Sequence, residues 1–204
     1  DMKGGHDLDE VDMTFDIIKG APFHWSKLYA TNITGTIHWF GQWLALTNIA
    51  AKLYDGSGTG FADFDFRPVE HDCDYDFGFT LNDVNLHLLA ENLSLKTNHL
   101  EGRLDAHVIV TNASSDNWHS WNGGGSAKLR NGLLWDIPLF GILSPALNAV
   151  SPGLGSSRAT EAAGKFIITN GVIYTDSLNI GLTLSRLQYV GTVDLASTDP
   201  QAVG

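Results

Sequence analysis

Apolar and polar residues alternate along much of this chain, and an alternation with a period of two predicts β-strands. Residues two apart in a strand project from the same face, so each run builds an apolar face backed by a polar one. The runs cover residues 33–39, 61–66, 77–81, 104–110, 178–184 and 193–195. They predict a protein made mainly of β-strands.

Turn-forming residues separate these runs. Asn131-Gly132 and Asn170-Gly171 are typical of tight hairpins, because both residue types accept a positive φ. Residues 55–58 and 122–125, each rich in glycine, are also interpreted as turns. Short connections favour a largely antiparallel sheet, which we expect to form a single domain over residues 1–204.

Three glycines lie inside the predicted strands, each between apolar residues two positions away: Gly35, Gly102 and Gly191. Because they recur at unequal intervals, a solenoid of fixed period is not supported. Glycine inside a strand marks a bend, a bulge or the close approach of another backbone. We therefore expect these positions to curve the sheet.

Helical periodicity occurs in only two short stretches. Leu86, Leu89 and Leu93 predict two or three turns within residues 85–94. Apolar residues at helical spacing also predict a short helical cap over residues 138–150, interrupted where Ser144 and Pro145 can end one helix and start another.

Composition narrows the class of protein. With 204 residues of which 43% are hydrophobic, the chain can bury a core, and a single cysteine, Cys73, can form no internal disulfide. A net charge of -11 argues against nucleic acid as a partner. Residues 28–51 and 137–157 lack charges, but polar residues in the first and prolines in the second argue against membrane spans. The chain opens without a basic leader, and we expect it to be a piece of a longer protein.

Residues 70–76 are the densest set of candidate metal ligands. His71 and Cys73 would share one face of a strand, but a zinc site needs further ligands that the sequence does not supply nearby. We therefore expect no metal, no cofactor and a solvated turn. Similarly, the glycine-rich residues 56–60 precede a strand-like run rather than a helix, which favours a hairpin over a phosphate-binding loop.

Carboxylate pairs are the other candidate chemistry. Asp63 with Asp65, and Asp74 with Asp76, resemble the acid and base of a sugar-active enzyme, and a β-solenoid enzyme of that class is one hypothesis. However, two acids on one face of a strand more often form its solvated side. We therefore expect a protein that is not an enzyme.

The order of motifs from Gly123 onward resembles the AsmA-like C-terminal region of bacterial envelope proteins. A glycine-rich strand reaches Asn131-Gly132, a stretch similar to "ipLf..Ls..L" follows, and two further strands complete the pattern. Upstream segments fit more weakly. The matching segments are residues 123–134, 137–147, 162–176 and 190–195, with 33–39, 44–56 and 100–104 before them.

This resemblance implies an antiparallel sheet curled into an open, β-taco-like trough, as in the bridge-like lipid transfer superfamily. Members are typically anchored in the inner membrane by an N-terminal helix, which this chain lacks, and extend through the periplasm. They are implicated in moving phospholipid towards the outer membrane. The family contributes no catalytic residues.

The residues themselves point the same way. Two short helical stretches cannot cover the apolar face of so many strands, and an exposed apolar strip requires an occupant such as acyl chains. With a net charge of -11, headgroups are expected to stay in solvent while the tails lie within. The expected lipid-contacting residues are Phe64, Phe66, Phe77, Phe79, Leu104, Ala106, Val108, Leu178, Ile180 and Leu182.

The strand pattern leaves a second hypothesis open. A periplasmic scaffold would assist the assembly of outer-membrane proteins by adding their strands to its exposed edge. The expected partners are therefore phospholipid acyl chains, the inner membrane through an absent segment, and other envelope proteins.

Overall fold

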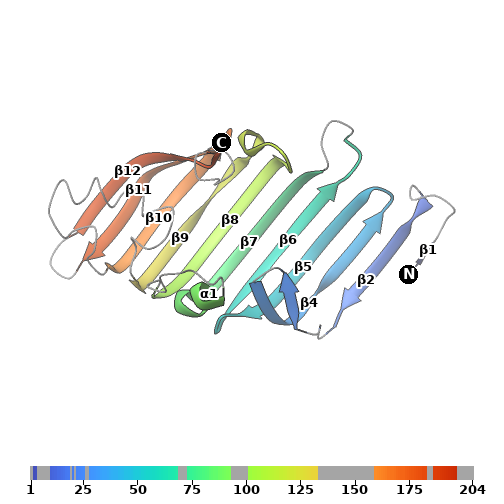
Figure 1. The fold of residues 1–204 in the computed structure, drawn as a ribbon, viewed down its shortest axis with the longest axis horizontal. Coiled ribbons are helices and arrows are strands. Elements are labelled where there is room, and N and C mark those ends of the chain that lie inside the picture. Colours follow the sequence, from blue (N-terminus) through green and yellow to red (C-terminus); the bar gives the residue numbers. More distant parts are fainter. Residues whose placement is uncertain are drawn as a thin grey trace.

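The computed structural model describes residues 2–3, 10–18, 20, 22–25, 28–68, 73–92, 101–132, 159–182 and 186–196. Over these ranges the chain forms one antiparallel β-sheet, accompanied by one short α-helix and a 3-10 turn (Figure 1). The helix α1 spans Leu86–Asn92, and the 3-10 turn spans Trp118–Ser120. The strands are β1 Met2–Lys3, β2 Asp12–Ile17, β3 Phe23–Trp25, β4 Leu28–Phe40, β5 Trp43–Leu53, β6 Gly56–Asp65, β7 Asp74–Asn85, β8 Arg103–Ser114, β9 Asn122–Gly132, β10 Ala159–Thr169, β11 Val172–Leu182 and β12 Arg186–Asp194.

Strands that follow one another in the chain also lie side by side. The order in the sheet is β1-β2-β4-β5-β6-β7-β8-β9-β10-β11-β12, while β3 pairs with the start of β4. Within the described ranges, β1 and β12 lie at opposite ends of the sheet, which is not closed. The expected fold, a curled and largely antiparallel open sheet, is confirmed.

The sheet curls because several strands contain bulges, where two residues of one strand face a single residue of its neighbour. A bulge bends its strand and increases the local twist. Each of four bulges places a residue at φ between 51° and 55°, a conformation that asparagine and aspartate accept more readily than other side chains. These residues are Asn32, Asn48, Asp83 and Asn112.

Two of these bulges are held by the side chain that they face. The N–H of Asp83 donates to Asp105 Oδ1 at 2.8 Å, and the N–H of Asn112 donates to Asp76 Oδ1 at 2.6 Å. Each carboxylate thus satisfies a backbone donor that the bulge removes from the regular ladder.

The glycines expected to curve the sheet fit this arrangement. Gly35, at φ 153°, sits at a register shift between β4 and β5, and an added Cβ there would collide with the side chain of Ile49. Gly102 has φ 110° just before β8, and Gly191 pairs with Thr175 beside a register shift.

The predicted turns are partly confirmed. Asn170-Gly171 joins β10 to β11 with both φ values positive. The interpretation of 55–58 as a turn is wrong after Asp55, because the turn is the tight pair Tyr54-Asp55 and β6 begins at Gly56. The Asn131-Gly132 pair ends β9, and the residues after it lie outside the described part.

The interpretation of 122–125 as a turn is also wrong, because these residues begin β9. The glycines among them allow the backbone of a neighbouring strand to approach closely; they do not reverse the chain. An added Cβ at Gly123 would collide with the carbonyl oxygen of Ile109 on β8, and one at Gly125 would collide with that of His107.

Helix α1 confirms the helix expected within residues 85–94, whereas the cap expected at 138–150 lies outside the described residues. None of the helices in the described ranges has the length and apolar character needed to cross a bilayer. Two clusters form the core. One joins Leu86 and Ala90 of α1 to Leu129, Ala162, Leu178 and Ile180 of the sheet, and the other consists of Val110, Ala113 and Ile168.

Candidate functional site: an apolar face shared by ten strands

The pairing register brings apolar residues from ten strands onto one face of the sheet. Residues directly opposite each other in an antiparallel pair project from the same face, so each row of partners can be followed across the sheet. One row contains only apolar residues and glycine from β2 to β12. It consists of Phe15, Ile37, Leu46, Ala62, Phe77, Val110, Gly123, Ile168, Ile173 and Val193.

Two more rows extend this face towards α1. The first consists of Gly60, Phe79, Val108, Gly125 and Phe166, and the second of Val84, Leu104, Leu129, Ala162, Ile180 and Leu187. We call the surface formed by these three rows and their flanking residues the apolar face.

The register places most of the expected lipid-contacting residues on the apolar face. Phe66 follows the end of β6, with its ring stacked 6.3 Å from that of Phe64. The side chain of Leu182 lies outside the described part. The residues that the register brings together are Phe64, Phe77, Phe79, Leu104, Ala106, Val108, Leu178 and Ile180.

The apolar face has a covered part and an open part. Leu178 and Ile180 are buried in the cluster that includes α1, with Ile180 only 1% exposed. Phe64, Phe77 and Phe79 are half-buried. Among the described residues of β2 and β4 to β6, no apolar side chain is fully buried. The accessible part of the face therefore lies on β2, on β4 to β6 and at the half-buried phenylalanines of β7, whereas Val84 of β7 and Val110 and Ala113 of β8 are buried.

Neighbouring aromatic rings, most of them stacked, form the centre of the accessible part. Rings follow one another at 6.2–6.3 Å from Phe66 through Phe64, Tyr75 and Phe77 to Phe79. Burial raises the pKa of the Tyr75 phenol, so this ring is uncharged at physiological pH, as an ordinary tyrosine also is.

Sequence reasoning missed two members of this aromatic cluster. The ring of Trp121 lies edge-on to Tyr75 at 6.1 Å and to Phe77 at 5.6 Å. Tyr75 was detectable, since it lies two residues before Phe77 on the same strand. Trp121 follows a 3-10 turn outside any alternating run, so no sequence signal assigned it to this face.

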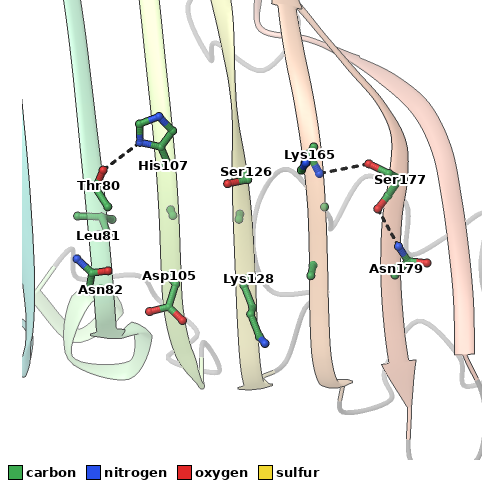
Figure 2. A pocket seen from close by; sticks show the side chains of 14 residues that line it. Thr80, Leu81, Asn82, Asp105, His107, Ser126, Lys128, Lys165, Ser177 and Asn179 are labelled. Atoms are coloured by element: carbon green, nitrogen blue, oxygen red, sulfur yellow. Dashed lines mark hydrogen bonds between the residues drawn. The ribbon is translucent and has the colours of Figure 1, made fainter.

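The opposite face is mostly polar, although it also carries exposed apolar residues such as Phe61 and Ile167. Thr80, His107, Ser126 and Lys165 are successive cross-strand partners, and they line a groove of about 600 Å³ together with Ser177 and Asn179 (Figure 2). The Thr80 hydroxyl lies 2.9 Å from His107 Nδ1, and the Ser177 hydroxyl accepts the Lys165 N–H at 3.4 Å. The groove offers hydrogen bonds to water, as expected of the solvated side of a one-layer sheet.

The carboxylate pairs also lie on the polar face. Asp63 is opposite Asp76, and Asp65 is opposite Asp74. Burial, followed by the nearby Asp76 charge, raises the pKa of Asp63. In contrast, the hydrogen bonds from Arg67 lower the pKa of Asp65 to about 2.

The candidate metal ligands do not form a cluster in the part of the chain that the structure describes. Cys73 is buried, and its thiol donates to the carbonyl of Asp74 at 3.2 Å, while His71 lies outside the described residues. Across the described ranges, no group of three histidine, cysteine, aspartate or glutamate side chains is placed to hold a metal ion.

Comparison with known proteins adds no relative: no protein family, curated protein or solved structure matches this chain. The apolar face is therefore the feature on which a functional proposal rests.

Proposed function

We propose that this chain is a lipid-binding and lipid-conducting module whose apolar face holds phospholipid acyl chains. The observation that carries the proposal is the row of apolar residues and glycine across ten strands, which over its N-terminal part is exposed at Phe15 and only half-buried on β4 to β6. A water-exposed apolar strip of this extent is costly unless it has an occupant.

Acyl chains suit this surface energetically. Exposing a chain to water costs about 0.8 kcal/mol per CH₂ group, whereas moving it from a bilayer onto an apolar sheet exchanges one apolar medium for another. Conduction needs a continuous apolar path and no chemical step. The successive rows from Phe77 to Phe79 and on to Leu81 provide such a path along β7.

The biological setting follows from the sequence resemblance, as part of the same proposal. The module would belong to a bacterial envelope protein that moves phospholipid between the inner and outer membranes, held by an anchor outside this chain. Headgroups would remain in solvent, because the net charge of -11 offers anionic groups no attraction.

The experiment compares lipid retention in two variants of adjacent residues. Phe79→Asp places a charge on the apolar face, and Thr80→Asp places the same charge on the polar face of the same strand. Each protein is purified from cells without detergent, and the co-purifying lipids are extracted and quantified by mass spectrometry.

We expect phospholipid with the unchanged protein and with Thr80→Asp, and a severalfold loss with Phe79→Asp, because an unpaired carboxylate is poorly tolerated among acyl chains. A cooperative urea transition in each variant shows that it remains folded. An unchanged protein that carries no lipid, or a Phe79→Asp variant that retains all of it, contradicts the proposal.

The free edge of β12 favours a second candidate function. Within the described residues, Arg186–Asp194 pairs on one side only, with β11, and Val190 on this strand is 66% exposed. An edge of nine residues can accept a strand from another protein, as a scaffold for outer-membrane proteins requires. Photocrosslinking separates the two functions, since a crosslinker at Val190 would capture protein and one at Phe79 would capture lipid.

A further inference from the structure

Exposed aromatic side chains gather at one end of the strands. Phe40 and Trp43 flank the two-residue turn between β4 and β5, Phe66 follows β6, and Trp118 lies in the connection from β8 to β9. Figure 1 shows the ends of β4, β6 and β8, from which these connections start, along the same edge of the sheet. Trp39 precedes Phe40, and together these five residues form what we call the aromatic rim.

The rim residues are unusually accessible for their size. The exposed fraction of these residues ranges from 38% at Trp39 to 56% at Phe40. They come from successive connections across β4 to β9 and are not gathered into one pocket. A line of aromatic groups along an edge can contact a broad, flat partner. It does not form the kind of pocket that receives a single side chain of a peptide.

The rim joins the apolar face through Trp39 and Trp118, whereas Phe40 and Trp43 lie in the cross-strand row of Asp65 on the polar face. Trp39 is the cross-strand partner of Leu44, and Leu44 is the partner of Phe64. At the other side, the ring of Trp118 lies 4.8 Å from that of Trp121, which contacts Tyr75 and Phe77. An acyl chain that moves along the apolar face towards this end would therefore leave it at the rim.

Polar groups accompany the rim aromatics. The indole N–H of Trp39 donates to the Gly41 carbonyl at 2.7 Å, and the guanidinium of Arg67 lies 5.8 Å from the centre of the Trp43 ring. Side chains with an apolar body and a polar attachment are those that proteins place at the level of lipid headgroups.

The acidic residues around the rim determine which bilayer charge it can approach. Asp12, Asp65 and Asp74 lie in the same cross-strand row as Phe40 and Trp43, and Arg67 is paired with Asp65 through a 2.6 Å contact. An acidic edge is repelled by an anionic bilayer and tolerated by a zwitterionic one.

We propose that the aromatic rim inserts into the headgroup layer of a zwitterionic phospholipid bilayer and docks the open end of the apolar face on it. This inference builds on the proposed lipid-conducting function, but membrane docking and lipid retention are separate properties that are measured separately.

The test uses sedimentation with vesicles of phosphatidylcholine, alone or mixed with phosphatidylglycerol. The rim variant combines Phe40→Ser with Trp118→Ser. The control is Phe61→Ser, since Phe61 is 41% exposed, close to the 40% of Trp118, but lies mid-strand on the polar face. Urea midpoints check that all the proteins fold.

We expect the unchanged protein and Phe61→Ser to bind phosphatidylcholine vesicles equally, the rim variant to bind at least about tenfold more weakly, and phosphatidylglycerol to weaken binding of all three. Detergent-free lipid retention should be the same in all three. Failure of the unchanged protein to bind phosphatidylcholine vesicles, equal binding by the rim variant, or stronger binding to the anionic vesicles overturns the inference. A protein that binds vesicles but never co-purifies with lipid refutes the proposed function and leaves the rim inference standing.

Discussion

Truncating Ile180 tests whether the cluster that includes α1 supports the sheet. Ile180 is 1% exposed and belongs to the same core cluster as Leu86 and Ala90 of α1. Changing it to alanine removes three carbon atoms, and at about 0.8 kcal/mol for each buried group the lost transfer free energy is about 2.4 kcal/mol. The remaining cavity adds to this, for a total cost of about 3 kcal/mol in the free energy of unfolding.

Ile167→Ala is the matched control. This residue has the same side chain, lies on the neighbouring strand β10 and is 59% exposed on the polar face, so its truncation should cost less than about 1 kcal/mol. Urea unfolding followed by circular dichroism measures both variants. With a slope of about 2.5 kcal/mol per molar urea, the Ile180→Ala midpoint should fall by about 1 M.

A shift for Ile180→Ala no larger than that for Ile167→Ala would refute the reasoning, because the side chain would then not be packed in a stabilising core. The result also bears on function. Leu178 and Ile180 were expected to contact lipid, and a large cost without any lipid present would show that protein groups already stabilise this part of the face.

Two further predictions concern close packing and pH. Gly125→Ala should lower the free energy of unfolding, measured in urea, by about 2 kcal/mol or more. The added Cβ would collide with the His107 carbonyl oxygen and lie 2.8 Å from the Phe166 ring. The control Gly181→Ala should cost little, because the nearest contact of its Cβ would be the Thr160 hydroxyl at 3.3 Å. Asp63→Asn and Asp65→Asn should have opposite effects on the urea midpoint. The raised pKa of Asp63 means that its ionisation destabilises the folded state, so Asp63→Asn should stabilise the protein at pH 7, with the gain vanishing as the pH falls below the pKa of Asp63. Asp65, with its pKa lowered to about 2, contributes stability above pH 3.8 that is lost as the pH falls towards 2, so Asp65→Asn should destabilise the protein at pH 7. The same sign for both variants would contradict this assignment.

The apolar face illustrates how parity alone can locate a functional surface. Phe77 and Phe79, or Ala106 and Val108, share a face because neighbouring residues of a strand point in opposite directions, and no tertiary information is needed for that. Ala113 joins the same face although parity counted from Val110 places it on the other side. The bulge at Asn112 resets the alternation, and its need for a positive φ is hardly visible in the sequence.

The sequence by itself determined the class of fold, an open antiparallel sheet with very little helix, and it determined which side chains share a face between bulges. Both depend on the local geometry of the strand. Only the tertiary structure decided that the glycines at 123–125 lie in a strand, since their role is the close approach of a neighbouring backbone. Only it decided that Ile180 is buried while Phe64 stays accessible, and that Trp118 meets Trp121 beside Tyr75. These outcomes depend on which strands become neighbours and where a seven-residue helix packs, and contacts between residues far apart in the chain leave no periodic trace in the sequence.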